Sequence, residues 1–172
     1  NNGVVRLTST STDALTLNGS DLHTLRVDGN GTVTMTDDLV ALRGSLIVAT
    51  GTLRTASNTL SIAGSLDATG GVVDFGSSTV LFDSTDTGEV VDPGANNFYN
   101  VQVSGASGGW TFASATTTND FRLLAANTFT LGSGETLSVG GVFSNAVGGT
   151  ATIWTGSTLT LRGSNAYTVG GK

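Results

Sequence analysis

The stretch TLSIAGSL, residues 59–66, alternates Thr or Ser with Leu or Ile and then turns at Gly64. In a β-strand this period of two places the apolar side chains on one face and the hydroxyl side chains on the other. The pattern returns in TLSVGGVF, residues 136–143, and in TLTL, residues 158–161. No window repeats apolar residues at helical spacing, so the chain is predicted to be all-β with almost no helix.

Short runs of this kind follow one another from Val4–Leu7 and Ala14–Leu17 to Tyr167–Val169, and Gly, Asn, Asp or Ser separate them. No run is predicted between Phe112 and Phe121. Grouped in threes, the runs give a period of about 20 residues, as from Ser45 to Ser65 and from Phe121 to Val142. An antiparallel sandwich, the alternative, prefers longer strands joined by hairpins. The short strands favour a parallel β-solenoid with three strands per coil and a narrow apolar core.

The chain also repeats itself at longer range, because residues 15–82 return as residues 90–161 with small insertions. Leu25, for example, matches Val101, and the offset grows along the chain from about 76 to 79 residues. Self-similarity at a fixed period is typical of stacked repeat units. We therefore expect one solenoid domain over residues 1–172, with four coils in each copy of the repeat.

Composition and charge exclude several classes of function. The chain of 172 residues has a net charge of −6, and its single lysine is Lys172. Binding to nucleic acid or anionic lipid needs a basic stripe, which this sequence lacks. No apolar run approaches the roughly 20 residues of a membrane span. There is no cysteine for a disulfide or a thiolate metal site, and the low charge with abundant Ser, Thr and Gly is typical of a secreted or surface protein.

The densest acidic cluster is a candidate calcium site, although a charged loop is more often simply solvated. Its members lie within ten residues and are Asp83, Asp86, Glu89 and Asp92. Asp86-Thr87-Gly88 also matches the triplet of aspartic proteases, but no second Asp is placed to share its proton. This triplet is therefore interpreted as a polar turn. No other cofactor is expected.

Two further patterns are weaker still. Asp28, Asn30 and Thr32 have the spacing of the first three ligands of a calcium loop, but the later Gly and Glu of that loop are missing. This segment is better interpreted as an Asn-Gly turn that leads into a strand. His23 is the only histidine and has no candidate partner, so a Ser-His-Asp site is not expected. We predict no catalytic residue and a non-enzymatic protein.

Aromatic residues could form a stacking platform for surface glycans, and the candidates are Tyr99, Trp110, Trp154 and Tyr167. Their alternation with Val, Phe and Ile predicts that most of them instead pack within or between coils. Asn18-Gly19-Ser20 and Asn30-Gly31-Thr32 are glycosylation sequons, which matter only in a host that uses them.

Four stretches are distinctive: FYNVQVSG (98–105), WTF (110–112), ETLSVGG (135–141) and STLTL (157–161). They resemble tandem repeats in large secreted bacterial surface proteins of the adhesin and exoprotein type, such as filamentous-haemagglutinin-like passengers. The resemblance implies a right-handed parallel β-helix, an extracellular location, and a role in attachment, surface coating or filament building. It implies no catalytic residues, because the family shares none.

The two ends of the sequence look like interior repeats, since VVRL (4–7) matches TVLF (79–82) and TLTL (158–161). We therefore expect the ends to pair with further coils, in the same polypeptide or in another copy. The sequence favours a structural or adhesive module that forms a rod, stalk or filament subunit. A carbohydrate-binding or carbohydrate-processing β-helix is the alternative. Ice binding through Thr arrays is a third possibility, but Thr-x-Thr occurs only sporadically.

Overall fold

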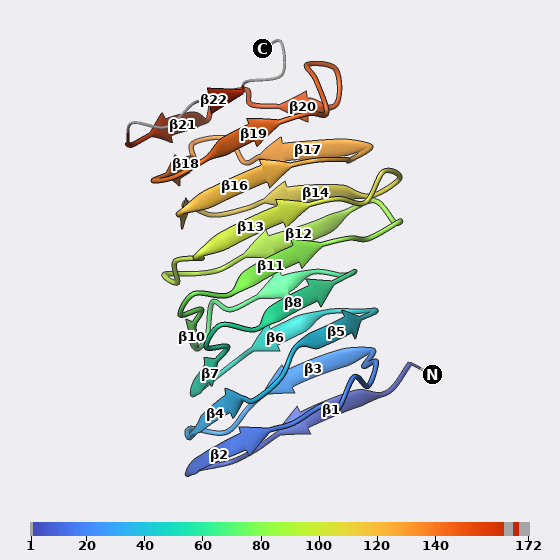
Figure 1. The fold of residues 1–172 in the computed structure, drawn as a ribbon, viewed down its shortest axis with the longest axis vertical. Coiled ribbons are helices and arrows are strands. Elements are labelled where there is room, and N and C mark those ends of the chain that lie inside the picture. Colours follow the sequence, from blue (N-terminus) through green and yellow to red (C-terminus); the bar gives the residue numbers. More distant parts are fainter. Residues whose placement is uncertain (1, 164–166, 169–172) are drawn as a thin grey trace.

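The computed structural model is a β-solenoid of eight coils, in which residues 2–163 and 167–168 are described. The coils wind in a right-handed sense from the amino-terminal end to the carboxy-terminal end (Figure 1). Strands of successive coils pair in parallel about 20 residues apart, as Val4 with Thr24 and Leu46 with Leu66. The predicted parallel β-helix is confirmed, and the antiparallel sandwich is wrong. No helix that could span a membrane occurs among the described residues.

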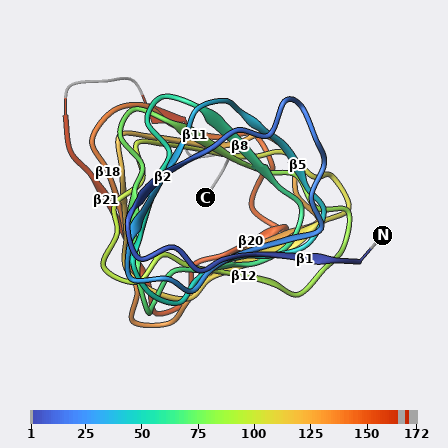
Figure 2. The same ribbon diagram turned by 90° about the horizontal axis from the view of Figure 1, so that it is seen from below.

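Three faces surround the core when the molecule is seen along its axis (Figure 2). The first face is one sheet of eight strands: β1 (Val4–Leu7), β3 (Thr24–Val27), β6 (Leu46–Val48), β9 (Leu66–Asp67), β12 (Glu89–Asp92), β14 (Gly109–Phe112), β17 (Thr128–Leu131) and β20 (Thr152–Ile153).

The second face consists of two shorter sheets. One contains β2 (Thr12–Leu15), β4 (Thr32–Met35), β7 (Thr52–Arg54) and β10 (Val72–Asp74). The other contains β15 (Thr116–Thr118), β18 (Thr136–Val139) and β21 (Thr158–Leu161).

The third face is a sheet of seven strands: β5 (Leu39–Leu42), β8 (Thr59–Ile62), β11 (Thr79–Phe82), β13 (Asn100–Val103), β16 (Asp120–Leu123), β19 (Phe143–Asn145) and β22 (Tyr167–Thr168). Most coils therefore have the predicted three strands. We number the coils 1 to 8 by their first-face strand, from β1 to β20.

The core consists of columns of inward side chains from successive coils. On the first face Leu25 pairs with Leu46 and Leu46 with Leu66, and each is at most 1% exposed. The outward neighbours in these strands are partly or fully exposed, as the alternation of the sequence predicts. Each fully buried Leu or Val stabilises the fold by about 1.5–3 kcal/mol. The narrow solenoid is therefore held together by inward side chains that pack against those of the next coil.

Aromatic rings fill the core of coils 4 to 8, whereas coils 1 to 3 are filled by aliphatic side chains. The contacts begin with Phe75 and Phe98, whose ring centroids are 4.5 Å apart. They continue through Phe112, which contacts three other phenylalanines, and end at Trp154. All seven phenylalanines of the chain belong to this series. Edge-to-face and tilted contacts of this kind add about 0.5–1.5 kcal/mol per pair beyond burial.

The backbones of successive coils approach each other closely at the corner between the first and second faces, which explains why glycine occurs there. Gly51 has a φ of 67°, and a Cβ added there would lie 2.0 Å from the carbonyl oxygen of Gly29 in the coil below. Any side chain at this position would push the two coils apart. Glycine, which adopts a positive φ without steric cost, therefore allows the chain to bend from β6 into β7 here.

The second face is interrupted in coil 5, where no strand lies between β10 and β15. The side chain of Asn96 bridges this gap. Its Oδ1 accepts a hydrogen bond from Val73 N at 3.0 Å, and its Nδ2 donates to the carbonyl oxygen of Pro93 at 2.7 Å. The same Nδ2 lies 3.3 Å from the carbonyl oxygens of Ala68 and Gly71. One amide thus replaces part of the missing backbone ladder.

Three sequence predictions about strands need correction. β15 was not predicted, because its inward residues, Thr116 and Thr118, are buried threonines rather than apolar side chains. β2 begins at Thr12, not at Ala14. Phe121 pairs with Phe143 rather than with Val142. Of the predicted run at the end, Val169 lies outside the described residues.

The long repeat does not equal four coils, so that prediction is wrong. Leu25 lies in β3 on the first face, whereas its match Val101 lies in β13 on the third face of coil 5. The offset between the two copies is therefore one face short of four full coils. What repeats is the strand pattern that all three faces share, since each face needs the same alternation of inward and outward residues.

Candidate functional site

The predicted acidic cluster is divided between two faces. Asp83 follows β11 on the third face, Asp86 lies in an exposed turn, and Glu89 and Asp92 lie on β12 of the first face. Asp92 already accepts hydrogen bonds from Gly94 N and from the hydroxyl of a serine in coil 6. Among the described residues, no three His, Cys, Asp or Glu side chains are grouped as metal ligands. The structure therefore brings no calcium ligand set together from these four.

Two of these carboxylates bind serine hydroxyls one coil away. Ser61 donates to Asp83 Oδ2, and Ser65 donates to Glu89 Oε2, each at 2.6 Å. The second oxygen of Asp83, Oδ1, is buried and has no hydrogen-bond partner among the described protein atoms. Asp83 and Arg43 both line a hollow of about 250 Å³. The main role of these carboxylates is to connect coils.

Two further carboxylates, Asp37 and Asp38, also connect coils. Asp37 accepts hydrogen bonds from Leu17 N at 2.8 Å and Asn18 N at 2.6 Å, and Asp38 accepts one from Thr59 N at 2.7 Å. Each bond satisfies a backbone donor at a corner where the ladder is broken. Sequence reasoning could not find these roles, because the donors lie about 20 residues away along the chain.

Asp28 forms ion pairs with two arginines of the first face, so it is not part of a calcium loop. It accepts hydrogen bonds from Arg6 Nε and, at 2.7 Å, from Arg26 Nε. Burial raises the pKa of Asp28, but the hydrogen bonds and charges of Arg6 and Arg26 lower it by more. The pKa of Asp28 therefore lies below its ordinary value of 3.8. Arg6 and Arg26 are register partners, so this carboxylate also relieves their mutual repulsion.

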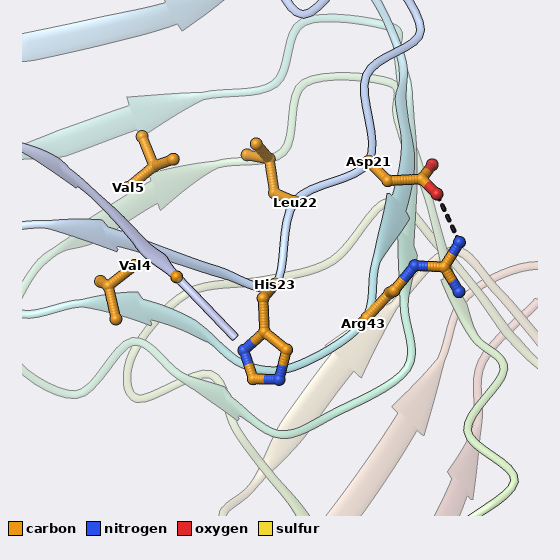
Figure 3. A pocket seen from close by; sticks show the side chains of 7 residues that line it. Val4, Val5, Asp21, Leu22, His23 and Arg43 are labelled. Carbon is orange, nitrogen blue, oxygen red and sulfur yellow. Dashed lines mark hydrogen bonds and ion pairs between the residues drawn. The ribbon is translucent and has the colours of Figure 1, made fainter. Parts of the chain in front are cut away.

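His23 lies beside a hollow at the amino-terminal end of the solenoid (Figure 3). Its Nδ1 is 3.1 Å from the hydroxyl of Thr24, which is its only hydrogen-bond partner among the described residues. Asp21 and Arg43 line the same hollow but pair with each other. Because Asp21 pairs with Arg43, no carboxylate among the described residues contacts the imidazole as in a Ser-His-Asp site.

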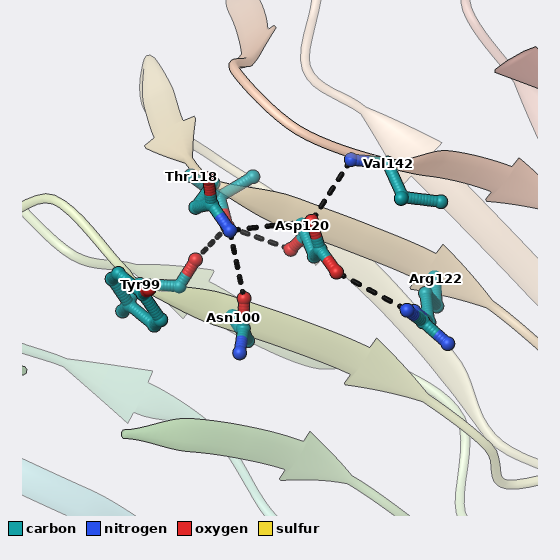
Figure 4. Close-up of polar contacts among 7 residues, drawn as sticks. Tyr99, Asn100, Thr118, Asp120, Arg122 and Val142 are labelled. Carbon is teal, nitrogen blue, oxygen red and sulfur yellow. Dashed lines mark hydrogen bonds and ion pairs between the residues drawn. The ribbon is translucent and has the colours of Figure 1, made fainter. Parts of the chain in front are cut away.

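A polar cluster at the corner between the second and third faces was not predicted (Figure 4). At its centre Asp120 accepts hydrogen bonds from Val142 N at 2.9 Å, from Asn119 Nδ2 at 3.2 Å and from Arg122 at 3.2 Å. The hydroxyl of Thr118 donates to the carbonyl oxygen of Asp120 at 2.8 Å. The cluster joins coils 6 and 7 and borders a hollow of about 150 Å³.

Most of the aromatic candidates pack within the solenoid, as predicted. Trp110 is 1% exposed and is enclosed by the turn at Gly105 and Gly108, so it cannot stack on a sugar. Trp154 is partly buried against Phe129. Tyr167 is half-buried. Tyr99, at 42% exposure, is the most open of the four and lies next to the Asp120 cluster.

Comparison with known proteins gives no relative: no protein-family model, no curated protein and no solved structure matches the chain. The fold and the side-chain contacts described above therefore carry the functional argument.

Proposed function

We propose that this chain is a non-enzymatic structural or adhesive module of an extracellular bacterial surface protein, acting as a rod, stalk or filament subunit through stacked coils. The observation that carries the proposal is the first-face sheet, whose eight strands pair in one order from β1 to β20. On this face the backbone ladder and the apolar column are continued by each next coil, so length is added along one axis. This is the geometry that a spacer or filament needs.

The distribution of polar groups supports the same proposal. Carboxylates are engaged in hydrogen bonds between coils, both the predicted candidates Asp83 and Glu89 and the unpredicted Asp120. Such contacts strengthen a stack against shear, because each one joins two coils that are otherwise held by the ladder and the core. The resemblance to adhesin-type repeats supports an extracellular location.

Labelling and force measurements test this proposal. An antibody raised against the chain is expected to label intact source cells, and labelling only after lysis would contradict a surface location. The purified chain, pulled between its ends, is expected to resist force and then release its coils in one or a few cooperative steps. A chain that extends smoothly at low force would contradict a load-bearing role.

Carbohydrate binding is a second candidate, favoured by the exposed ring of Tyr99 beside amide and guanidinium groups. Tyr99 and Asn100 lie on one side of Asp120 and Arg122 lies on the other (Figure 4), and Asn100 and Arg122 line the hollow beside it. An aromatic face next to hydrogen-bond donors and acceptors can stack on a sugar ring and bind its hydroxyls. Binding to a panel of immobilised mono- and disaccharides that Tyr99→Ala abolishes would favour this candidate, whereas unchanged or absent binding would exclude this surface.

A further inference from the structure

The first coil carries a charge at a position where the rest of the fold places apolar side chains. On the second face, Asp13 pairs with Val33, Val33 with Leu53, and Leu53 with Val73. Val33, Leu53 and Val73 are all inward and at most 4% exposed. Asp13 therefore occupies the first position of an apolar column, at the open amino-terminal end of the core.

Apolar side chains surround this carboxylate on the same end face. Val5 continues the inward column of Leu25 yet remains 37% exposed, because it lies in the first coil that the structure describes. Leu7 and Leu15, the inward partners of Val27 and Met35, are only partly buried. Together with Leu22, these side chains would favour a further coil stacked beneath coil 1, since burial of their exposed surface is favourable.

Two serine hydroxyls hold Asp13 on this face. Ser9 Oγ donates to Asp13 Oδ2, and Ser11 Oγ lies 3.4 Å from the same oxygen. Ser11 N donates to Ser9 Oγ at 3.1 Å, which fixes the turn between β1 and β2. Both hydroxyls are neutral, so the carboxylate has hydrogen bonds but no counter-charge among its hydrogen-bond partners. Its charge is tolerated here because the end face is open to water.

A second copy stacked in the register of the body would bring β21 against β2. The inward residues of β21 are Leu159 and Leu161, which continue the columns of Leu137 and Val139. In this arrangement Leu159 would face Asp13. The carboxylate would then lose water without gaining a cation, which is strongly unfavourable for an uncompensated buried charge. Inward-pointing charges on edge strands are a recognised means of preventing such pairing.

We propose that Asp13 is a charge gate on the amino-terminal end of the solenoid, whose carboxylate keeps the last coil of a second copy from stacking on coil 1. The inference rests on the proposed stacking function and adds its regulation. The exposed apolar side chains of the end face favour stacking of a second copy, and the charge of the Asp13 carboxylate opposes it. Removing the charge therefore opens the end to head-to-tail assembly.

Asp13→Val tests the gate, because valine is the residue that the column itself uses at Val33 and Val73. Sedimentation velocity over a range of concentrations at neutral pH, with negative-stain electron microscopy, reports assembly. The variant is expected to form rods that are multiples of the single chain in length, with an association constant at least about a hundredfold higher than that of the parent chain. Asp86→Val removes the same charge from an exposed turn away from both ends and is expected to leave the chain as single rods. Asp13→Leu, which matches Leu53, is a second variant with the same expected result.

A change at the opposite end tests which surface is the partner. Leu159→Asp, added to the Asp13→Val chain, is expected to return it to single rods. Thr160→Asp, on the outward side of the same strand, is expected to leave the assembly intact. Assembly that survives Leu159→Asp would overturn the head-to-tail partner.

The outcomes separate the gate from the proposed stacking. If the parent chain assembles as readily as Asp13→Val, the gate is wrong and end-to-end stacking stands. Asp13→Val and Asp13→Leu could instead fold, as circular dichroism would show, but never assemble. In that case the proposal of stacking between copies is wrong, and the proposal of the gate is wrong as well.

Discussion

Arg6 and Arg26 lie opposite each other on neighbouring strands of the first face, and Asp28 pairs with both. Since the pKa of Asp28 is lowered in the folded chain, its ion pairs stabilise the fold above the pKa of the unfolded chain. This stabilisation is lost as the pH falls through the folded pKa. The arginines, which stay charged, then repel each other.

Asp28→Asn is therefore expected to destabilise the chain at pH 7 and to have a smaller effect at an acidic pH below the lowered pKa of Asp28, where the parent carboxylate is protonated. Urea unfolding of the two chains at both pH values gives the difference in free energy of unfolding. A difference that stays constant between the two pH values would contradict the ion-pair role.

The two sequons are also two Asn-Gly sequences, and the structure distinguishes them chemically. In deamidation the backbone nitrogen after Asn attacks the side-chain Cγ, ammonia leaves, and water opens the resulting succinimide to Asp or isoaspartate. Gly31 N donates to the carbonyl oxygen of Ser9 at 2.9 Å, so it is held in the ladder. Gly19 N has no hydrogen bond among the described contacts, and a Cβ added at Gly19 would meet nothing within 4 Å. Asn18 itself is exposed, with a φ of 51°.

Asn18 is thus expected to deamidate several times faster than Asn30 during incubation in mildly alkaline buffer. Peptide mapping by mass spectrometry measures both sites in one sample. Urea-unfolded protein is the control, in which the two rates should become similar. Equal rates in the folded chain would contradict the protection attributed to the ladder.

At the scale of one element, Asn96 and its neighbour Asn97 form a matched pair in the interrupted part of the second face. Asn96 bonds to Val73 N and to the carbonyl oxygen of Pro93, whereas Asn97 is exposed and has no side-chain hydrogen bond among the described contacts. Asn96→Ala is expected to lower the free energy of unfolding by about 1–3 kcal/mol, because it leaves a backbone N–H without a partner. Asn97→Ala should change it by less than about 0.5 kcal/mol. Urea unfolding measures both, and equal effects would show that Asn96 is not a bridge.

Phe112 tests the aromatic part of the core. Its ring contacts Phe82, Phe121 and Phe129 at centroid distances of 5.2–5.8 Å. Phe112→Ala is expected to destabilise the chain by about 3–5 kcal/mol, and Phe112→Leu by less, because leucine leaves a smaller cavity. Tyr99→Ala, on the surface, is the control and should cost little. Thermal and urea unfolding that ranks Tyr99→Ala with Phe112→Ala would contradict the packing.

The sequence was sufficient to predict strands whose inward residues are apolar, such as β8 and β18, since alternation alone marks them. It failed for β15, because buried Thr116 and Thr118 look like the threonines of an outward face. It also could not predict the Asp120 cluster, because the partners of this carboxylate include a backbone N–H one coil away. A period of two identifies the faces of a strand but not the register between coils.

At the scale of the whole molecule, the coils form a nearly one-dimensional stack in which each coil contacts mainly its neighbours. The middle coils are covered on both sides, whereas coil 1 and the described part of coil 8 are covered on one side. Their burial reflects this difference: β1 is almost entirely exposed, but alternate residues of β3 and β13 are buried. Stability should therefore vary along the axis rather than be uniform.

Amide hydrogen exchange is expected to follow this gradient. Amides of β8, β11, β13 and β16 should exchange most slowly, because their opening requires the separation of two coil interfaces. Those of β1, β2 and β21 should exchange faster, since one interface suffices. Exchange followed by mass spectrometry on peptides from each coil measures the profile, and Asp13→Val assembled into longer rods provides an internal comparison. Protection of β1 and β2 should rise in those rods to the level of the middle coils, since a second copy then covers them. A flat profile in the single chain would contradict the expected difference in stability between the terminal and the middle coils.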